Sequence, residues 1–374
     1  MNARALLLGS VLALSCAGSA PVDVDPIREV DASASGDARD DAGPRDATSP
    51  DDVVDATKSD ASASDTRAAD AVNADAPGTD ASGAHAIETV WVIVEENHSW
   101  ASIRGSSSAP YINKTLLPIA AHAEQYYTPP GNHPSEPNYI WLEAGDNLGI
   151  TNDDDPSKNH QSTNEHLVAK LQAAGISWRS YQEDMPDPTK CPLVSSGLYG
   201  AKHNPMVFFD DVTNARDPLS KNCLEHVKPF PQLLSDLSAG TIARYNFITP
   251  NLCNDMHGQT LGTSCLGLTT DLIKRGDDWL AALVPKIMST EAYKTGGAIF
   301  IVWDEGDEKL LGDASDGPIG LLVVSPFAKK GASNTVKYTH SSLLRTLQDI
   351  FGVGPYLRDA AKATNLADLF TTFP

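Results

Sequence analysis

Several features that would assign a common function are missing from this chain of 374 residues. It has only five cysteines, and none of them form a CxxC pair, which argues against a structural zinc site. No glycine-rich phosphate-binding loop and no internal repeat occurs. The formal net charge is −21, and no basic patch with interleaved aromatic residues is present, so nothing indicates nucleic-acid binding.

The apolar run near the N-terminus, residues 5–14, is too short for a stable transmembrane helix. It follows Arg4 and precedes small residues that end at Cys16, which is the pattern of an export signal. The residues before Cys16 also fit a bacterial lipoprotein cleavage site, where the cysteine is lipid-modified and tethers the mature chain to a membrane. Ordinary signal cleavage nearby is the alternative. We therefore expect residues 1–16 to be a signal peptide and the protein to be exported, as a cell-surface lipoprotein or in secreted form.

Aromatic residues are absent from residues 21–84, and large apolar residues are rare there. Such a segment cannot bury enough surface to offset the entropy of ordering. It carries 16 acidic and 5 basic residues, a net charge of −11, so about half of the chain's negative charge lies in it. We predict that residues 17–84 form a disordered linker extended by its own charge, and that residues 85–374 form one catalytic domain.

The predicted domain contains four cysteines, an even number in a chain expected to be exported, which favours two disulfides. Their order along the chain suggests Cys191 with Cys223 and Cys253 with Cys265, although four cysteines allow three pairings. A zinc site is the competing interpretation.

Short, nearly continuous apolar runs predict strands that are buried on both faces, and therefore a mostly parallel sheet. These runs are residues 89–94, 176–181, 243–248, 298–303 and 320–324. Helical patterns occur at residues 164–174, 230–237, 277–289, 341–351 and 360–370. The predicted class is α/β, with helices on both faces of the sheet.

Polar residues come directly after several of these runs. Glu96 and Asn97 follow the first run, and Asp304 with Glu305 follows the fourth. Ligands bind at the carboxyl ends of the strands in open α/β sheets, so these residues should meet in one crevice. Hard oxygen ligands of this kind suit a divalent cation. A single carboxylate after a strand is usually a cap or a solvated turn, but two such pairs favour a metal site.

Ser135 lies in the segment His133-Pro134-Ser135-Glu136-Pro137-Asn138-Tyr139, ahead of helix-compatible residues. A helix starting near Pro137 would place Ser135 at its N-terminus, where free amides and the helix dipole favour an anion and an ionised serine. The simpler interpretation is a helix cap. Beside the carboxylate pairs, a nucleophile is favoured.

Histidine and amide side chains complete the candidate site. Asp255, His257 and His340 could bind a second cation, or could bind phosphate and protonate the leaving oxygen. His203 and His133 are weaker candidates for these last two roles, and Asn138 could orient phosphate or cap its turn. We predict catalytic roles for Ser135, His203 and His257, and substrate contacts for Asn97, Asn138 and His133. The predicted metal ligands are Glu96, Asn97, Ser135, Asp304, Glu305, Asp255 and His340.

Six ordered motifs resemble those of the phosphoesterase family, which groups secreted acid phosphatases with bacterial phospholipases C inside the alkaline phosphatase superfamily. The motifs are ENHS at 96–99, HPSEPNY at 133–139, ISW with YQEDMP at 176–186, KHNP at 202–205, TPN with NDMH at 249–257, and WDE at 303–305. The resemblance extends over residues 89–370, nearly the whole predicted domain.

The resemblance implies a three-layer α/β/α sandwich and a covalent mechanism in which Ser135 attacks phosphorus and water hydrolyses the phosphoserine. Glu96, Asn97, Asp304 and Glu305 match positions around the metal beside the nucleophile, while Asp255, His257 and His340 match those around the second metal of two-metal members. Classical alkaline phosphatases have Asp-His where this chain has Asp304-Glu305. This difference leaves open whether the site binds one metal ion or two.

From these observations we expect an exported acid phosphatase that hydrolyses phosphomonoesters with a divalent cation. The motifs between residues 133 and 185 look closer to the acid phosphatase branch, which includes bacterial members that act on phosphoinositide monoesters. A phosphodiesterase of the phospholipase C type is one alternative, and a noncatalytic surface-binding protein is another. The sequence sets no oligomeric state.

Overall fold

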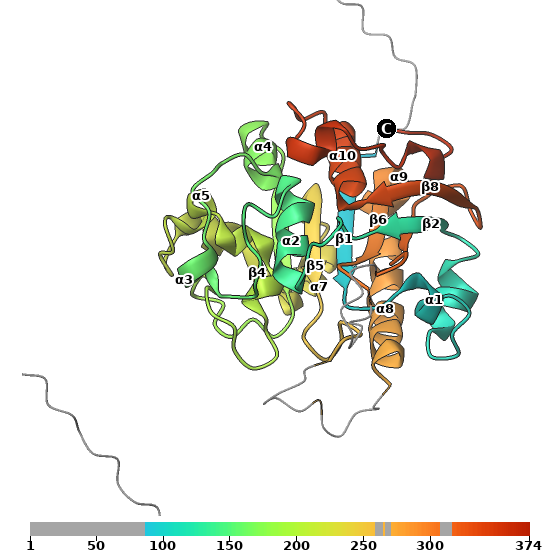
Figure 1. Ribbon diagram of the computed structural model, residues 1–374, viewed down its shortest axis with the longest axis horizontal. Coiled ribbons are helices and arrows are strands. Elements are labelled where there is room, and N and C mark those ends of the chain that lie inside the picture. The colour runs from blue at the N-terminus through green and yellow to red at the C-terminus, as the bar shows by residue number, and fades with distance from the viewer. Residues whose placement is uncertain (1–86, 259–264, 266–270, 307–315) are drawn as a thin grey trace, which may run out of the picture. The chain divides into compact units, whose positions relative to one another are not determined.

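Eight strands form one sheet in the computed structural model, which describes residues 87–258, 265, 271–306 and 316–374. Their order across the sheet is β4-β3-β5-β1-β6-β7-β2-β8, and Figure 1 shows β1 between β5 and β6. The strands are β1 (Thr89–Glu95), β2 (Ala121–Tyr127), β3 (Trp178–Gln182), β4 (Val227–Pro229), β5 (Tyr245–Thr249), β6 (Gly297–Trp303), β7 (Leu321–Val324) and β8 (Ser333–Thr339).

The centre of the sheet is parallel and fully buried. All seven residues of β1 pair with β6 in parallel register, from Thr89 with Gly297 to Glu95 with Trp303, and every residue of both strands is buried. Strand β5 pairs with β1 in the same direction. Strand β7 is antiparallel to both of its neighbours, so the sheet is mostly parallel as predicted. The carboxyl ends of β5, β1 and β6 therefore meet at one edge.

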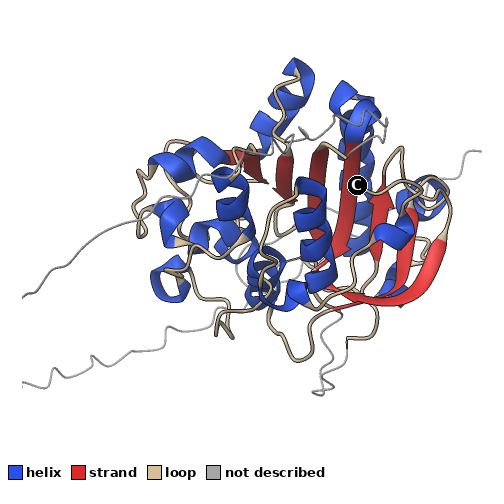
Figure 2. Ribbon diagram, turned by 90° about the horizontal axis from the view of Figure 1, so that it is seen from above, coloured by secondary structure: helices blue, strands red, loops and turns tan. Residues whose placement is uncertain are grey.

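Helices cover both faces of this sheet, as Figure 2 shows. Helices α2, α4 and α10 contact one another, and α8 contacts α9, so the molecule has the predicted α/β layered architecture. The helices are α1 (Trp100–Ile103), α2 (Ser135–Ala144), α3 (Pro156–Asn159), α4 (Leu167–Ala173), α5 (Asp210–Thr213), α6 (Lys221–His226), α7 (Phe230–Ala239), α8 (Leu272–Ser289), α9 (Glu291–Gly296) and α10 (His340–Phe351).

The predicted strands are confirmed with shifts of one or two residues at their ends, whereas the predicted helix at 360–370 is wrong. That segment forms two 3-10 turns, Arg358–Ala361 and Ala367–Leu369. Between them, Asn365 Nδ2 donates to Asp349 Oδ2 at 2.7 Å, and the Leu366 amide donates to Thr346 Oγ1 at 2.9 Å. Hydrogen bonds to α10 thus replace those that a continuous helix would make.

Two disulfides, Cys191–Cys223 and Cys253–Cys265, confirm the suggested pairing. Their Cα atoms lie 5.6 and 5.7 Å apart, within the usual range. The zinc interpretation of these cysteines is therefore wrong. Cys16, the predicted signal peptide and the predicted linker lie outside the described residues. Within the described residues, no helix has the length and apolar content needed to cross a membrane.

Helix α2 carries Ser135 at its first position and ends on Gly145, which has a left-handed backbone with φ of 72°. A Cβ atom at Gly145 would lie 2.7 Å from the Leu357 carbonyl oxygen and 3.2 Å from Leu344 Cδ2. Gly240 caps α7 with a similar φ of 69°, but no atom lies within 4 Å of its Cβ position. The end of α2 is therefore pressed against the segment after α10.

We predict that Gly145→Ala destabilises the protein more than Gly240→Ala. Both substitutions place a side chain in the left-handed region, which costs roughly 1–2 kcal/mol. Only Gly145→Ala adds a steric conflict with a carbonyl, and overpacking of this kind costs roughly 1–3 kcal/mol more. Denaturant unfolding of the two variants measures the difference, and equal losses would contradict the proposed packing of α2.

Candidate active site

Three loops from the central strands are joined by backbone hydrogen bonds at one edge of the sheet. The amide of Glu96, directly after β1, donates to the Asp255 carbonyl at 2.7 Å. The amide of Asp304, directly after β6, donates to the Glu95 carbonyl at 3.0 Å. The amide of Asn97 then donates to the Asp304 carboxylate at 3.1 Å. The carboxylates predicted from separate parts of the sequence are thus brought together as expected.

Ser135 faces this group from the N-terminus of α2. Its hydroxyl Oγ lies 3.4 Å from Glu96 Oε2, and the residue is only 2% exposed. Helix α2 has ten residues, so its dipole and free amides favour negative charge at this end. A helix N-terminus favours the ionised form of the Ser135 hydroxyl, and its role as nucleophile stays a prediction.

Lys202 also contacts Ser135, although Lys202 is not among the site residues predicted from the sequence. Its Nζ lies 3.5 Å from Ser135 Oγ and 2.9 Å from Asp153 Oδ2. Burial alone would lower the pKa of Lys202. The negative charges of Glu96 and Asp153 nearby have a larger effect and raise that pKa. A fixed positive charge therefore lies beside the hydroxyl. Lys202 could have been predicted from the sequence by its position in the KHNP motif, next to the predicted site residue His203.

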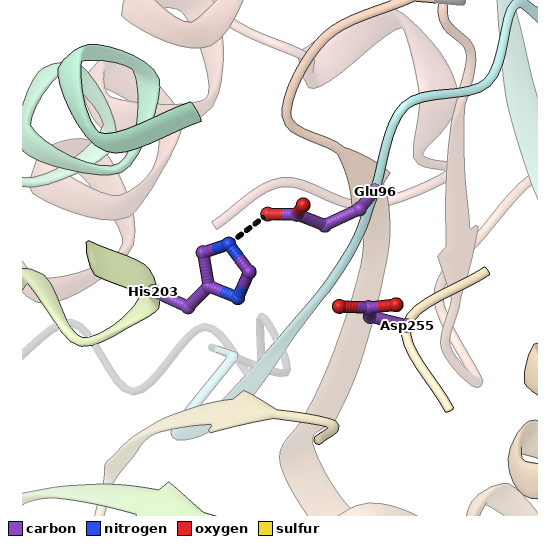
Figure 3. Close-up of side chains that lie close together, drawn as sticks. All are labelled: Glu96, His203 and Asp255. Atoms are coloured by element: carbon purple, nitrogen blue, oxygen red, sulfur yellow. Dashed lines mark ion pairs between the residues drawn. The ribbon is translucent and has the colours of Figure 1, made fainter. Parts of the chain in front are cut away.

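Glu96 is the centre of the site. Its Oε1 lies 2.5 Å from His203 Nε2, and its Oε2 lies 3.5 Å from His257 Nδ1. Burial alone would raise the pKa of Glu96, but the charge of His203 and its hydrogen bond hold that pKa well below the usual value. Figure 3 shows the polar atoms of Glu96, His203 and Asp255 converging, and ligand atoms of these three residues lie within 4.8 Å of one another.

The carboxyl groups of Asp304, Asp255 and Glu95 have raised pKa values. Burial raises the pKa of Asp304 well above its usual value, and the charges of Glu96 and Glu305 add to this effect. Burial and the charge of Glu96 likewise raise the pKa of Asp255 to about 8. Glu95 is fully buried and its pKa is also raised well above normal, first by burial and then by the Asp255 charge. These groups need a proton or a cation to be stable.

Buried oxygen atoms of the site that have no hydrogen-bond partner among the described residues include Asn97 Oδ1, Asp255 Oδ2, Asp304 Oδ2 and both carboxylate oxygens of Glu95. Buried polar atoms are rarely left unpaired, so each requires an explanation. Carboxylate and amide oxygens are the ligands that hard divalent cations prefer. The residues present therefore fit a divalent cation, with Glu96, Asn97, Asp255 and Asp304 as the groups that would hold it.

The Glu305 carboxylate contacts two residues that we predicted to bind substrate. Asn138 Nδ2 donates to Glu305 Oε2 at 3.0 Å, and His133 Nδ1 lies 2.6 Å from the same oxygen. The Asn138 amide group also donates to the Asn132 carbonyl and accepts from the Asn132 side chain. Because its hydrogen-bonding capacity is used, Asn138 orients Glu305, in place of the predicted contact with phosphate.

His340 does not direct a nitrogen atom to the carboxylates. Its Nδ1 lies 3.1 Å from the Tyr126 hydroxyl, and its Nε2 lies 2.6 Å from the Asp304 carbonyl oxygen. Burial lowers the pKa of His340 to about 4, so the ring is neutral. These contacts correct the prediction of a metal ligand, because both nitrogens are engaged by protein groups. His340 instead fixes the backbone at Asp304.

Comparison with known proteins gives a family match and several relatives. The model of the phosphoesterase family matches residues 120–354. A phosphatidylinositol-3-phosphatase of Mycobacterium tuberculosis is 31% identical over 283 residues, which cover 75% of this chain and 82% of that protein. A phosphate-repressible acid phosphatase of Penicillium chrysogenum is 29% identical over 232 residues, covering 59% of this chain and 50% of the relative. The match therefore spans about half of the length of that fungal enzyme.

Two solved structures are similar to this chain at low sequence identity. The crystal structure of Ps i-CgsB has a TM-score of 0.50 and 12% identity, covering 75% of each chain. A protein in the alkaline phosphatase superfamily from Vibrio parahaemolyticus has a TM-score of 0.48 and 9% identity, covering 76% of this chain and 72% of that one.

We predict that a divalent cation stabilises the wild-type protein and fails to stabilise Asp304→Asn. A ligand that binds only the folded state at 100 times its Kd adds about 2.7 kcal/mol. Thermal unfolding after chelation and titration with Mg²⁺, Mn²⁺, Ca²⁺ or Zn²⁺ measures this as a rise in Tm. Asp277→Asn is the matched control, because Asp277 is a buried carboxylate that accepts the backbone amides of Tyr111 and Ile112 and is not among the groups that would hold the cation. An equal rise for Asp304→Asn would exclude Asp304 as a ligand.

Proposed function

This chain belongs to the phosphoesterase family and is a phosphoric ester hydrolase, and we propose that it cleaves phosphomonoesters through Ser135 as an acid phosphatase. The observation that carries the proposal is the place of the Ser135 hydroxyl, at a helix N-terminus between Glu96 and Lys202. The phosphatase names of the relatives support a monoester, and the phosphatidylinositol-3-phosphatase supports phosphoinositide monoesters among the substrates.

In the proposed reaction, Ser135 Oγ forms a bond to phosphorus while the bond from phosphorus to the leaving oxygen breaks. The leaving oxygen takes up a proton and departs as the alcohol. Water then attacks the phosphoserine, which releases inorganic phosphate and restores the Ser135 hydroxyl. The Lys202 charge, 3.5 Å from Oγ, stabilises the ionised hydroxyl and the phosphate that replaces it. A bound divalent cation would supply further stabilisation of both negative charges.

His257 is the group best placed to protonate the leaving oxygen. Its side chain is 27% exposed, so substrate can reach it, and it lies between Glu96 and the Asn97 amide at 3.5 Å from each. The hydrogen bond to Glu96 raises the pKa of His257, which keeps the ring protonated to higher pH. His203 is only 1% exposed and its Nε2 is held on Glu96, so we propose that it orients Glu96.

We also propose that residues 1–16 direct export, that Cys16 is lipidated, and that residues 17–84 tether a catalytic domain at 85–374. The two disulfides support an oxidising compartment outside the cytoplasm. A charged linker of this length would hold the domain away from the membrane surface.

Ser135→Ala is expected to reduce hydrolysis of p-nitrophenyl phosphate by at least about 10³-fold, because the step that forms the phosphoserine is lost. Steady-state kinetics measures the loss. Ser341→Ala is the matched control, since Ser341 is a buried serine in the first turn of α10 that hydrogen-bonds Trp141 and Asp359. Near-normal turnover by Ser135→Ala would remove Ser135 from the mechanism.

His257→Asn is expected to slow substrates with poor leaving groups much more than those with good ones. An alkyl phosphate needs a proton on the leaving oxygen, and general acid catalysis contributes roughly 10²-fold or more. The p-nitrophenolate of p-nitrophenyl phosphate leaves without a proton, so its turnover should change by less than about tenfold. Comparing kcat for glycerol phosphate and p-nitrophenyl phosphate tests this, and equal losses would show that His257 is not the acid.

A further inference from the structure

A cavity of about 400 Å³ opens beside the candidate active site, at the carboxyl ends of β2 and β8. Its wall is largely apolar, from Tyr127, Pro129, Pro130 and Pro318, and its charged residues are Asp316 and Lys337. Strands β2 and β8 are parallel, and their register places Gln125 opposite Lys337 and Tyr127 opposite Thr339. Parallel pairing therefore sets this cavity at the same edge of the sheet as the catalytic loops.

His133 separates the cavity from the catalytic carboxylates. Its Nε2 lies 3.2 Å from Asp316 Oδ1 on the cavity side, and its Nδ1 lies 2.6 Å from Glu305 Oε2 on the catalytic side. Gly131 of the cavity wall lies four residues before Ser135, so their Cα atoms are at most about 14 Å apart. A substrate with its phosphate at Ser135 can therefore extend past His133, whose side chain is 36% exposed, into this cavity.

Lys337 supplies a positive charge that no carboxylate of the described residues neutralises. Its Nζ lies 5.1 Å from the centre of the Tyr127 ring, and no carboxylate in the described part of the chain forms an ion pair with it. Asp316, the acidic residue of the same cavity, is already paired with His133. An aromatic and proline wall with one unpaired cation suits a ring that carries an anionic group.

We propose that this cavity receives the leaving group of the substrate, and that Lys337 binds a second anionic group on that leaving group. The inference rests on the proposed phosphomonoesterase activity of Ser135, and it makes Lys337 a residue that determines specificity. The second anionic group is either a free phosphate or the phosphodiester of a lipid headgroup. Both present the same negative oxygens to Lys337.

The test compares kcat/KM of the full chain for three substrates: inositol 3-phosphate, inositol 1,3-bisphosphate and a short-chain phosphatidylinositol 3-phosphate. The wild-type enzyme should prefer at least one of the two substrates that carry a second anionic group over inositol 3-phosphate. Lys337→Gln should reduce that preference about fivefold, the effect of losing about 1 kcal/mol from a solvent-accessible charge pair. Lys337→Arg should retain the preference to within about twofold, because the charge is kept.

Lys330→Gln is the matched control, because it removes the same charge from an exposed lysine that precedes β8, away from its carboxyl end. It should leave the preference unchanged. If Lys337→Gln loses the preference for the soluble bisphosphate, the second group is a free phosphate; if it loses the preference for the lipid, the second group is the phosphodiester. Either result supports the proposal. An unchanged preference in Lys337→Gln, or an equal loss on all three substrates, would overturn it. Absence of turnover on p-nitrophenyl phosphate by the wild-type enzyme would instead reject the proposed function itself.

Discussion

The structure depends on a group of carboxylates that is held together out of water. Glu95, Glu96, Asp255, Asp304 and Glu305 are all buried at one edge of the sheet, with His203 and His257 as the neighbouring imidazoles. Two like charges 4 Å apart repel by about 4 kcal/mol at an effective dielectric constant of 20. Such crowding is unfavourable for folding unless positive charge is added. Burial first, and then the negative charge of Glu96, raises the pKa of both Asp255 and Asp304.

The fold maintains this arrangement through its backbone. The seven paired residues of β1 and β6 place Glu96 and Asp304 side by side, and the backbone contacts among the loops after β1, β5 and β6 fix their directions. His340 contacts the Asp304 carbonyl oxygen, and the Asn138 side chain donates a hydrogen bond to the Glu305 carboxylate. The proposed nucleophile, Ser135, comes from a separate layer, on α2, whose far end packs against the segment after α10. Positioning thus comes from rigid elements, and the reactive atoms lie where those elements meet.

The features that depend on local sequence pattern could be predicted from the sequence. Unbroken apolar runs located β1 and β6, and the polar residues directly after them located the site. The sequence was insufficient where tertiary contacts decide. Strand β8 alternates between exposed and half-buried residues over most of its length and gave no apolar run, so it was missed, as were β2 and β4. The roles of His340 and Lys202 depend on which way each side chain points, and one sequence contains no such information.

We infer that a divalent cation completes the carboxylate group next to Ser135. Anomalous X-ray diffraction from crystals of the protein grown with Mn²⁺ tests this most directly, because it locates the ion independently of the protein model. We predict a peak in contact with Asn97 and Asp304, beside Ser135, where buried oxygen atoms lack partners. A fully folded crystal with no ion at these residues, or with one only on the protein surface, would contradict the account.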